Sequence, residues 1–255
     1  MTSRVHVEVS GGTAHVELTR PEARNAVDLP MCLELRAAFE DLDADESVRV
    51  VLLSGRGPVF CAGADLKERT GRDAAWVRRR RQASFAAYAA VEACSRPVVA
   101  LLQGTVVGSG GELALAADFA LATDDVTFRF PEPHWGTVGA TQRLQRAIGR
   151  RRAKELLYTN RPMSACEAVD LGVVSKLVPA ADLVTAGFDT AARIAKAPPA
   201  AIALTKRAID LGAETDLDRG IRIEMAAIEQ NLADGDWQAG VSRFREQHDT
   251  QKGRR

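Results

Sequence analysis

The apolar and polar positions follow one pattern in the first half of the chain and another in the second. In the first half, short apolar runs predict strands, and segments with apolar positions at helical spacing follow them. From about residue 139 the helical pattern dominates, and only the apolar run at 173–178 interrupts it. This order predicts an α/β core followed by a helical appendage. We place the boundary at Ala197 and the prolines after it, which gives a core of residues 1–197 and a helical region of residues 198–255.

The same patterns give the individual elements. Two strands are expected around the turn at Gly11 and Gly12, and continuous apolar runs at 48–54 and 98–102 are typical of strands buried on both faces. Asp28 can cap the first helix. The expected strands are 4–9, 14–19, 48–54, 98–102, 119–122 and 126–130. The expected helices are 29–42, 72–93, 141–148, 150–158, 164–169, 180–196, 199–211, 215–233 and 236–247.

Two glycine-containing stretches follow the two buried strands, and each is expected to lead into a helix. The first glycine loop, residues 60–68, reads FCAGADLKE, and the second glycine loop, residues 104–112, reads GTVVGSGGE. Together they can direct two backbone N–H groups, one from each loop, at the same small target. A pair of amides aimed at one oxygen is how a protein stabilises an enolate or a tetrahedral oxyanion.

Two carboxylates accompany these loops. Glu112 lies one turn into the second expected helix, and Glu132 follows twenty residues later between two prolines. An acidic side chain in a first helical turn also complements the helix dipole, which is the simpler interpretation of Glu112 and equally of Asp65 and Glu68. Glu132 has no such helix, and its prolines would hold the carboxylate in place, with a surface turn as the ordinary alternative. An oxyanion site with two carboxylates is sufficient for proton chemistry beside a carbonyl.

Composition narrows the class of protein. With 255 residues and 46% apolar content, the chain can bury a core without disulfides or metals. Lys plus Arg equals Asp plus Glu at 34 each, so the net charge gives no reason to expect nucleic acid or an anionic membrane as partner. The isolated cysteines and scattered histidines favour neither a disulfide framework nor a metal site, and they fit a reducing cytoplasm. Neither a secretory leader nor a membrane span is expected.

Other chemistries fit less well. The second glycine loop fails the last position of GxGxxG, and neither loop matches GxxxxGK[ST], so a nucleotide site is disfavoured. No GxSxG or Cys–His arrangement marks a nucleophile. The four arginines at 78–81 are typical of a solvated helix face, with contact to an anionic ligand as the alternative. His134 lies two residues from Glu132, and a surface or packing role is its ordinary interpretation.

Several segments, taken in their order and spacing, resemble the enoyl-CoA hydratase/isomerase (crotonase) superfamily over most of the chain. These segments are residues 18–26, 60–69, 97–100, 104–118, 130–132, 141–144 and 168–174. The resemblance implies an α/β fold, a spiral core of repeated ββα turns, followed by a C-terminal helical region that builds a trimer or a dimer of trimers. It also implies an acyl-CoA substrate, with coenzyme A carried by the substrate and no separate cofactor.

The resemblance further implies roles for individual residues. The backbone N–H groups of Ala64 and Ser109 match the two donors to the thioester oxygen. Glu112 and Glu132 match the two glutamates of members that hydrate a double bond, in which Glu112 takes a proton from water and Glu132 delivers one to Cα. The positions that match substrate-lining segments are Arg24, Ala26, Ala62, Ala64, Asp65, Leu66, Lys67 and Ser109. Lys67 is placed to meet a phosphate of CoA.

Some positions depart from the superfamily pattern. Ser109 stands where glycine is usual, and segment 136–142 is shorter and less glycine-rich than the usual loop after the second glutamate. Bulky His134 and Trp135 fall in the same region, and residues 244–248 match the usual ending only in part. The expected function is an enoyl-CoA hydratase, a lyase. The alternatives are another acyl-CoA reaction (isomerase, decarboxylase or dehydratase), a catalytically silent CoA-binding relative, or a nucleotide-binding oxidoreductase.

Overall fold

The computed structural model describes residues 3–234, 237–238 and 240–242. The expected helix at 236–247 lies largely outside the described residues, and the segment 244–248 lies wholly outside them. The chain divides into two compact units, Met1–Ile194 (unit 1) and Ala195–Arg255 (unit 2). The catalytic and helical domains expected at 1–197 and 198–255 stay a prediction.

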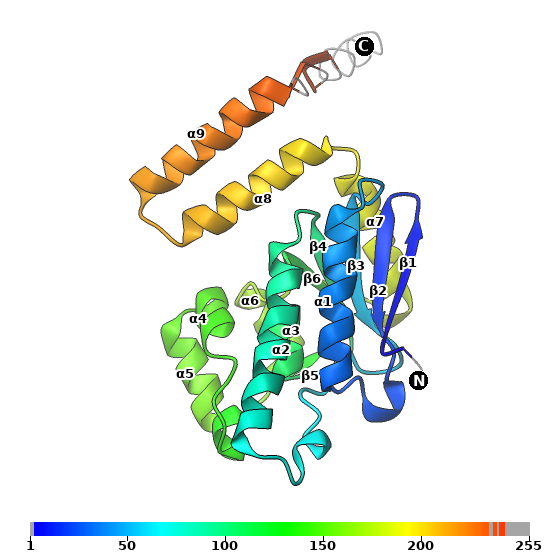
Figure 1. Ribbon diagram of the computed structural model, residues 1–255, viewed down its shortest axis with the longest axis vertical. Coiled ribbons are helices and arrows are strands. Elements are labelled where there is room, and N and C mark those ends of the chain that lie inside the picture. Colours follow the sequence, from blue (N-terminus) through cyan, green and yellow to red (C-terminus); the bar gives the residue numbers. More distant parts are fainter. Residues whose placement is uncertain (1–2, 235–236, 239, 243–255) are drawn as a thin grey trace. The chain divides into compact units, whose positions relative to one another are not determined.

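Unit 1 is built on a largely parallel sheet with strand order β1-β2-β3-β4-β6-β9 (Figure 1). β1 and β2 form the expected antiparallel hairpin, and every further pairing in this sheet is parallel. A second, small sheet has the order β5-β7-β8. The strands are β1 Val5–Ser10, β2 Thr13–Leu18, β3 Val50–Gly55, β4 Val98–Leu102, β5 Thr105–Val107, β6 Phe119–Thr123, β7 Thr127–Arg129, β8 Met163–Ser164 and β9 Lys176–Val178.

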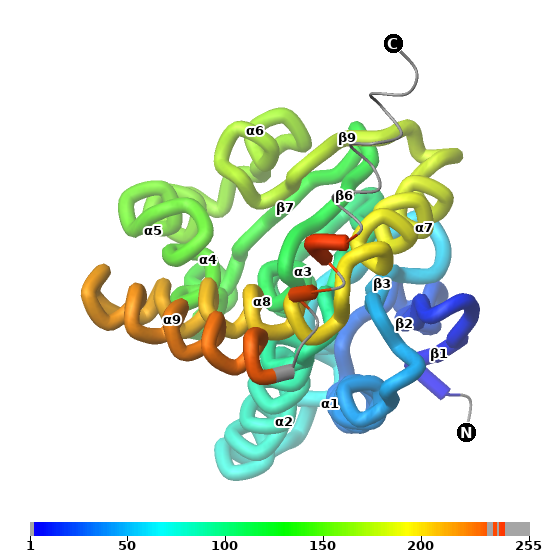
Figure 2. Tube along the Cα trace, turned by 90° about the horizontal axis from the view of Figure 1, so that it is seen from above, coloured from blue at the N-terminus to red at the C-terminus, as the bar shows by residue number. Residues whose placement is uncertain are grey.

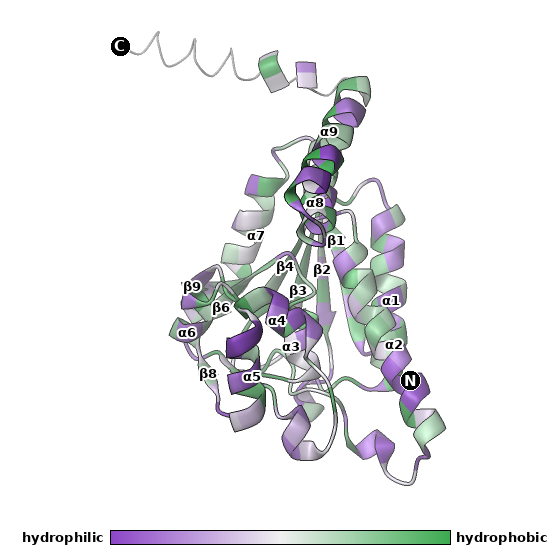
Figure 3. Ribbon diagram, turned by 90° about the vertical axis from the view of Figure 1, so that its left-hand side faces the viewer, coloured by the Kyte–Doolittle hydropathy of each residue, from purple (hydrophilic) through white to green (hydrophobic). Residues whose placement is uncertain are grey.

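Helices cover both faces of the main sheet, as the two continuous apolar runs predict. Figure 3 shows α1 and α2 on one side of β3 and β4, and α7 on the other. Every residue of β3 and β4 is buried. Leu53 of β3 joins the core beneath α1 and α2, whereas Leu101 of β4 faces α7 and touches it at Gly187. A strand covered on both faces needs apolar side chains at successive positions rather than at alternate ones.

Some helices of unit 1 begin at polar side-chain caps, namely α1, α2 and α6. The Asp28 carboxylate accepts the Met31 N–H at 2.9 Å and caps α1, as predicted, and Asp73 caps α2 in the same way. α1 and α2 pack side by side (Figure 2). The helices of unit 1 are α1 Leu29–Ala44, α2 Ala74–Ala93, α3 Ser109–Ala114, α4 Gln142–Ile148, α5 Arg150–Thr159, α6 Ala165–Asp170 and α7 Leu183–Ile194. Short 3₁₀ helices are η1 Pro21–Ala23, η2 Lys67–Arg69, η3 Glu132–Trp135 and η4 Ala180–Asp182.

Three elements around the glycine loops differ from the expectation. The first loop leads only into the single turn of η2, and α2 starts five residues after that turn ends. Residues 105–107 form the unpredicted strand β5, which pairs with β7. Glu132, expected in a stiff segment without a helix, instead opens η3, because Pro133 fits the first turn of a helix and needs no N–H acceptor there.

Unit 2 contains a helical hairpin of α8 Pro199–Ala213 and α9 Leu217–Asp234, which pack against each other. Large apolar side chains on both helices are exposed, with Ile209 at 65% and Leu217 at 77%. In the part of the chain that is described, no helix combines the length and apolar character needed to cross a membrane.

Candidate active site

The two glycine loops lie directly against each other. Cys61 of the first loop forms a parallel bridge with Val106 of the second, and the Val107 N–H donates to the Cys61 carbonyl at 3.0 Å. Gly110 makes the close approach possible, since a Cβ added there would lie 2.5 Å from the Cys61 carbonyl oxygen. The two loops are therefore neighbours in the fold, and their expected service of one target stays a prediction.

In the first loop, the Ala64 N–H points away from Val27, the residue with which this segment pairs. Val27 runs parallel to this segment, donating its N–H to the Gly63 carbonyl and accepting the Asp65 N–H, both at 2.8 Å. In an extended chain, the peptide groups on either side of a paired position alternate in direction. The N–H of Ala64 consequently faces the second loop rather than Val27.

The second loop presents the Ser109 N–H at the start of a helix. Gly108, with φ of 46°, turns the chain into α3, and the first helical bond runs from the Glu112 N–H to the Gly108 carbonyl at 2.9 Å. The Ser109 N–H thus precedes the first intrahelical donor and has no acceptor within the helix, as at any helix start. The positive end of the helix dipole adds to the potential at this N–H.

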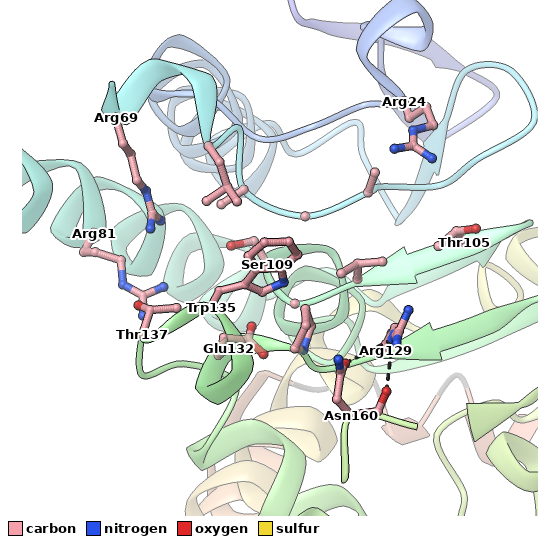
Figure 4. Close-up of a pocket in the computed structure, with 17 residues that line it drawn as sticks. Arg24, Arg69, Arg81, Thr105, Ser109, Arg129, Glu132, Trp135, Thr137 and Asn160 are labelled. Carbon is pink, nitrogen blue, oxygen red and sulfur yellow. Dashed lines mark hydrogen bonds between the residues drawn. The ribbon is translucent and has the colours of Figure 1, made fainter. Parts of the chain in front are cut away.

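Both residues line one pocket of about 530 Å³ in unit 1 (Figure 4). Arg69, Arg81 and Thr137 lie toward one end, Arg24 and Thr105 toward the other, with Ser109 and Glu132 between them. The full lining is Arg24, Ala62, Gly63, Ala64, Leu66, Arg69, Arg81, Thr105, Val107, Gly108, Ser109, Arg129, Pro131, Glu132, Trp135, Thr137 and Asn160.

The two candidate glutamates are both buried beside this pocket. Glu112, in the first turn of α3, is 4% exposed, and Glu132, at the start of η3, is 7% exposed. Glu132 lines the pocket, whereas Glu112 is not among its lining residues. A Cβ on Gly108 would come within 2.6 Å of the Glu132 Oε1, so a larger residue at position 108 would clash with the Glu132 carboxylate. Neither Oε2 atom has a hydrogen-bond partner among the described residues.

Burial favours the protonated form of both carboxyl groups. It raises the pKa of Glu112, while Arg81, Arg143 and the Ala140 amide act in the opposite direction. Burial likewise raises the pKa of Glu132, and the charge of Glu112 raises it further. Two coupled carboxyl groups in a partly dry site share protons because ionising one makes ionising the other harder.

A buried arginine holds the first loop from behind. Arg80 is fully buried and forms an ion pair with Glu68 and a hydrogen bond to the Val27 carbonyl, and its Nη1 donates to Ser84 at 2.6 Å. The second carboxylate oxygen of Glu68 accepts the Leu29 N–H at 2.9 Å. Glu68 therefore ties η2 to the start of α1, a more specific role than complementing a helix dipole.

The arginine run on α2 is not a uniformly solvated face. Arg78 and Arg79 are exposed, as expected, but Arg80 is in the core and Arg81 lines the pocket. The interpretation as a solvated face is wrong for Arg80.

The structure gathers some, not all, of the sequence-predicted residues at the pocket. Its lining contains Arg24, Ala62, Ala64, Leu66, Ser109 and Glu132. Outside the lining, Asp65 pairs with Arg20 at 3.0 Å, and the Ala26 carbonyl accepts from the same arginine at 2.6 Å. Lys67 is exposed, and His134 Nε2 lies 2.9 Å from the Tyr158 carbonyl oxygen. Within the described residues, no group of His, Cys, Asp and Glu is arranged to hold a metal ion.

Sequence reasoning missed several pocket residues. Arg129 and Asn160 come together from β7 and the end of α5, joined through the Arg129 Nε at 3.0 Å to both oxygens of Asn160 (Figure 4). Arg69 comes from η2, and Thr137 follows η3. These residues are far apart in the chain and carry no spacing signal, although the anionic-ligand alternative for 78–81 did include Arg81.

The sheet covered on both faces and the two glycine loops that open onto one pocket define an α/β protein of the crotonase fold. The crystal structure of enoyl-CoA hydratase from Bacillus anthracis superimposes with a TM-score of 0.92 at 34% identity, covering 96% of each chain. A Thermobifida fusca structure in complex with CoA gives a TM-score of 0.84 at 28% identity, over 91% of this chain and 94% of that one. The predicted fold class is confirmed. That the C-terminal helices build a trimer stays a prediction.

Sequence comparison leads to the same family. A family model described as enoyl-CoA hydratase/isomerase matches residues 8–254. YngF of Bacillus subtilis, whose name reads enoyl-CoA hydratase/isomerase, is 37% identical over 237 residues, or 91% of each chain. The protein belongs to the enoyl-CoA hydratase/isomerase family.

Proposed function

We propose that this protein is an enoyl-CoA hydratase, a lyase that reversibly adds water across the double bond of a 2-enoyl-CoA. The observation that carries the proposal is one pocket lined by Ala64, Ser109 and Glu132, with a second buried carboxyl group, Glu112, electrostatically coupled to Glu132. Family membership supports the acyl-CoA substrate, as does the related Thermobifida fusca structure in complex with CoA.

The two N–H groups form the oxyanion hole. Attack of water on Cβ moves electrons onto the thioester oxygen, and both amides donate to that oxygen as its charge grows. One donor placed in this way typically lowers the barrier by about 3 kcal/mol. The start of α3 adds its positive potential at the same point.

The two glutamates move the protons. Ionised Glu112 takes a proton from water as the water oxygen bonds to Cβ, and protonated Glu132 delivers a proton to Cα as the enolate collapses. The product carries the hydroxyl group on Cβ and the added hydrogen on Cα, so one water molecule is consumed. The raised pKa values of Glu112 and Glu132 fit these two roles, because the coupled pair then holds one proton: one carboxyl group is ionised and the other is protonated.

The CoA portion extends from the oxyanion hole toward Arg24. This arginine lies at the end of the pocket opposite to Arg69 and Arg81 (Figure 4), and Ala62 and Leu66 line the wall formed by the first loop. Arg24 and the exposed Lys67 supply positive charge for the phosphates of CoA. No cofactor beyond the CoA of the substrate is required.

Unit 2 is proposed to build the homo-oligomer, a trimer or a dimer of trimers. Its support is the exposed apolar surface of α8 and α9, including Ile209, Leu217 and Ile221. Light scattering of the purified full chain should give three or six times the mass of one chain, whereas a monomer would contradict this part of the proposal.

Mass spectrometry of a panel of acyl-CoA substrates tests the reaction. Crotonyl-CoA and longer or branched 2-enoyl-CoAs should gain the mass of one water, with loss of the conjugated absorbance. An unchanged mass with a moved double bond would indicate an isomerase, and loss of carbon dioxide would indicate a decarboxylase. Tight CoA binding without turnover would indicate a catalytically silent relative.

Isomerisation is the second candidate, and one observation favours it. Glu132 lines the pocket, whereas Glu112 is absent from its lining. A single accessible carboxyl group is enough to carry a proton from one carbon to another. The 3-enoyl-CoA isomers in the same panel separate the candidates, since an isomerase converts them to 2-enoyl-CoA without any gain of mass.

A further inference from the structure

Two arginines of the pocket face the acyl end without an anionic partner. Arg69 lies in η2 and Arg81 in α2, and Figure 4 shows both on the side of the pocket away from Arg24, with Ser109 and Glu132 between the two ends. Among the described residues, neither guanidinium group forms an ion pair or donates a hydrogen bond, and the Arg69 Nε is buried without an acceptor.

Two nearby arginines, by contrast, are paired with carboxylates. Arg80, one residue before Arg81, pairs with Glu68, and Arg143 pairs with Glu92 at 2.6 Å. Arg81 lies over the ring of Phe85, 5.6 Å from the ring centre, and no ion pair with a carboxylate is formed by its side chain among the described residues. Of the four arginines that line the pocket, Arg129 is bound to Asn160 and Arg24 lies at the other end, so Arg69 and Arg81 are the pair available at this end.

Their surroundings make an anion favourable at this end. Burial lowers the pKa of Arg69, and the charges of Arg80 and Arg81 lower it further, so the two guanidinium groups repel each other in a partly dry site. Arg81 also lies close to Glu132: its Nη2 and the Glu132 Cγ are 3.0 and 3.1 Å from the position that a Cβ on Gly139 would take. A guanidinium group presents a rigid fork of donors that matches a carboxylate.

The proposed binding mode assigns this end of the pocket to the acyl chain. With the thioester oxygen held by Ala64 and Ser109, and CoA extending toward Arg24, the carbon chain beyond Cβ runs toward Arg69 and Arg81. We propose that the substrate is the 2-enoyl-CoA of a dicarboxylic acid, whose distal carboxylate is bound by Arg69 and Arg81. This inference rests on the proposed function, because that function fixes the direction in which the acyl chain points.

Two further roles for the arginines are outcomes that the test must separate. They could hold a phosphate of CoA, which requires CoA to extend in the opposite direction. Alternatively, Arg81 could act only on the two glutamates, whose protons its charge disfavours. The first role predicts equal losses for every CoA compound when the arginines are removed, and the second predicts changed turnover without any preference for a charged acyl chain.

The test compares two substrates that differ only in the charge of the distal group. These are 4-carboxybut-2-enoyl-CoA and its neutral amide, 4-carbamoylbut-2-enoyl-CoA. The wild-type protein should hydrate the carboxylate compound with a kcat/KM about tenfold to a hundredfold higher, the range that hydrogen bonds to a charged group provide. Arg69→Gln and Arg81→Gln should each remove most of this preference. Arg79→Gln, an exposed neighbour on α2, should leave it intact.

Binding of the saturated analogues, measured by calorimetry, separates failure of this inference from failure of the proposed function. Tighter binding of 4-carboxybutanoyl-CoA than of its amide, lost in Arg69→Gln, supports carboxylate recognition even if neither unsaturated compound is hydrated. Equal kcat/KM and equal affinity for the charged and neutral compounds would overturn the inference while leaving a hydratase. Equal loss of free CoA binding in both variants would also overturn it, in favour of phosphate binding.

Discussion

The first glycine loop is held in place by polar side chains from outside the loop, whereas the second is held by the absence of side chains within it. Around the first, Val27 pairs with residues 63–65 and Arg80 ties Val27 to Glu68. In the second, Gly108 and Gly110 leave room for Glu132 and Cys61. The position of pocket-lining Ala64 thus depends on electrostatics, and the position of pocket-lining Ser109 depends on volume.

This difference implies that the two loops fail in different ways. A lost ion pair behind the first loop should mainly reduce stability, because it leaves a buried charge without compensation. An added methyl group in the second loop should mainly reduce turnover, because it displaces groups that contact the substrate.

Among the variants that alter how the loops are held, the largest effect is expected for Gly110→Ala. Its Cβ would meet the Cys61 carbonyl oxygen at 2.5 Å and force the two loops apart. A displacement of about 1 Å at a positioned group can reduce turnover about a hundredfold, so we expect a loss of that order in kcat/KM for crotonyl-CoA. Gly212→Ala in α8 is the matched control, since its Cβ has its nearest neighbour at 3.8 Å. Equal kinetics for both variants would show that the close contact of the loops is not needed.

Arg80→Met tests the first loop. It leaves Glu68 partly buried without its cation and should lower the free energy of unfolding in urea by about 3 kcal/mol. Arg80→Met combined with Glu68→Gln should recover part of that loss, because the unpaired charge is gone. The exposed Arg79→Met should stay within about 0.5 kcal/mol of the wild type. A stable Arg80→Met variant would contradict the proposed anchoring of this loop.

The pH dependence of stability tests the burial of Glu112 in the second loop. Its pKa is raised in the folded protein, so the folded state binds the proton more tightly than the unfolded state. The wild type should therefore lose stability relative to Glu112→Gln as pH rises from 4.5, the ordinary glutamate value, to the raised folded pKa, and the difference should be constant above it. Urea unfolding of both proteins across this pH range measures the difference in their free energies of unfolding. The control Glu46→Gln, at an exposed position, should show the same pH dependence as the wild type. If Glu112→Gln also showed the wild-type pH dependence, the raised pKa of Glu112 would be contradicted.

The smallest effect is expected for Ser109→Ala. The proposed donor is the backbone N–H, which the substitution keeps, so kcat/KM for crotonyl-CoA should change by less than about threefold. A much larger loss would mean that the hydroxyl group itself contacts the substrate, and the two loops would then differ in chemistry as well as in support.

Much of the fold could be predicted because its elements have strong and simple patterns. The run at 98–102 is β4 residue for residue, and Asp28 caps α1. β5 was missed because its three residues lie inside a glycine loop, and only pairing with β7 makes them a strand. Local pattern carries no information about such a partner.

The individual residues of the candidate site could be predicted from the sequence, but the way in which the fold brings them together could not. The two loops and the two glutamates stand out in the sequence, but the bridge between Cys61 and Val106 exists only in the fold. Consecutive arginines point about 100° apart around a helix, so Arg80 enters the core while Arg81 reaches the pocket. A run of identical residues conceals that difference until the helix is placed.

The most direct test of the proposed chemistry is the turnover number for crotonyl-CoA hydration in Glu112→Gln and Glu132→Gln, at saturating substrate and with folding checked by circular dichroism. Glutamine keeps the shape of each side chain and removes its proton transfer, so kcat should fall at least about a hundredfold in both variants. Glu46→Gln should retain the wild-type rate. If either site variant hydrates crotonyl-CoA as fast as the wild type, its glutamate does not move a proton and the two-carboxylate mechanism is wrong.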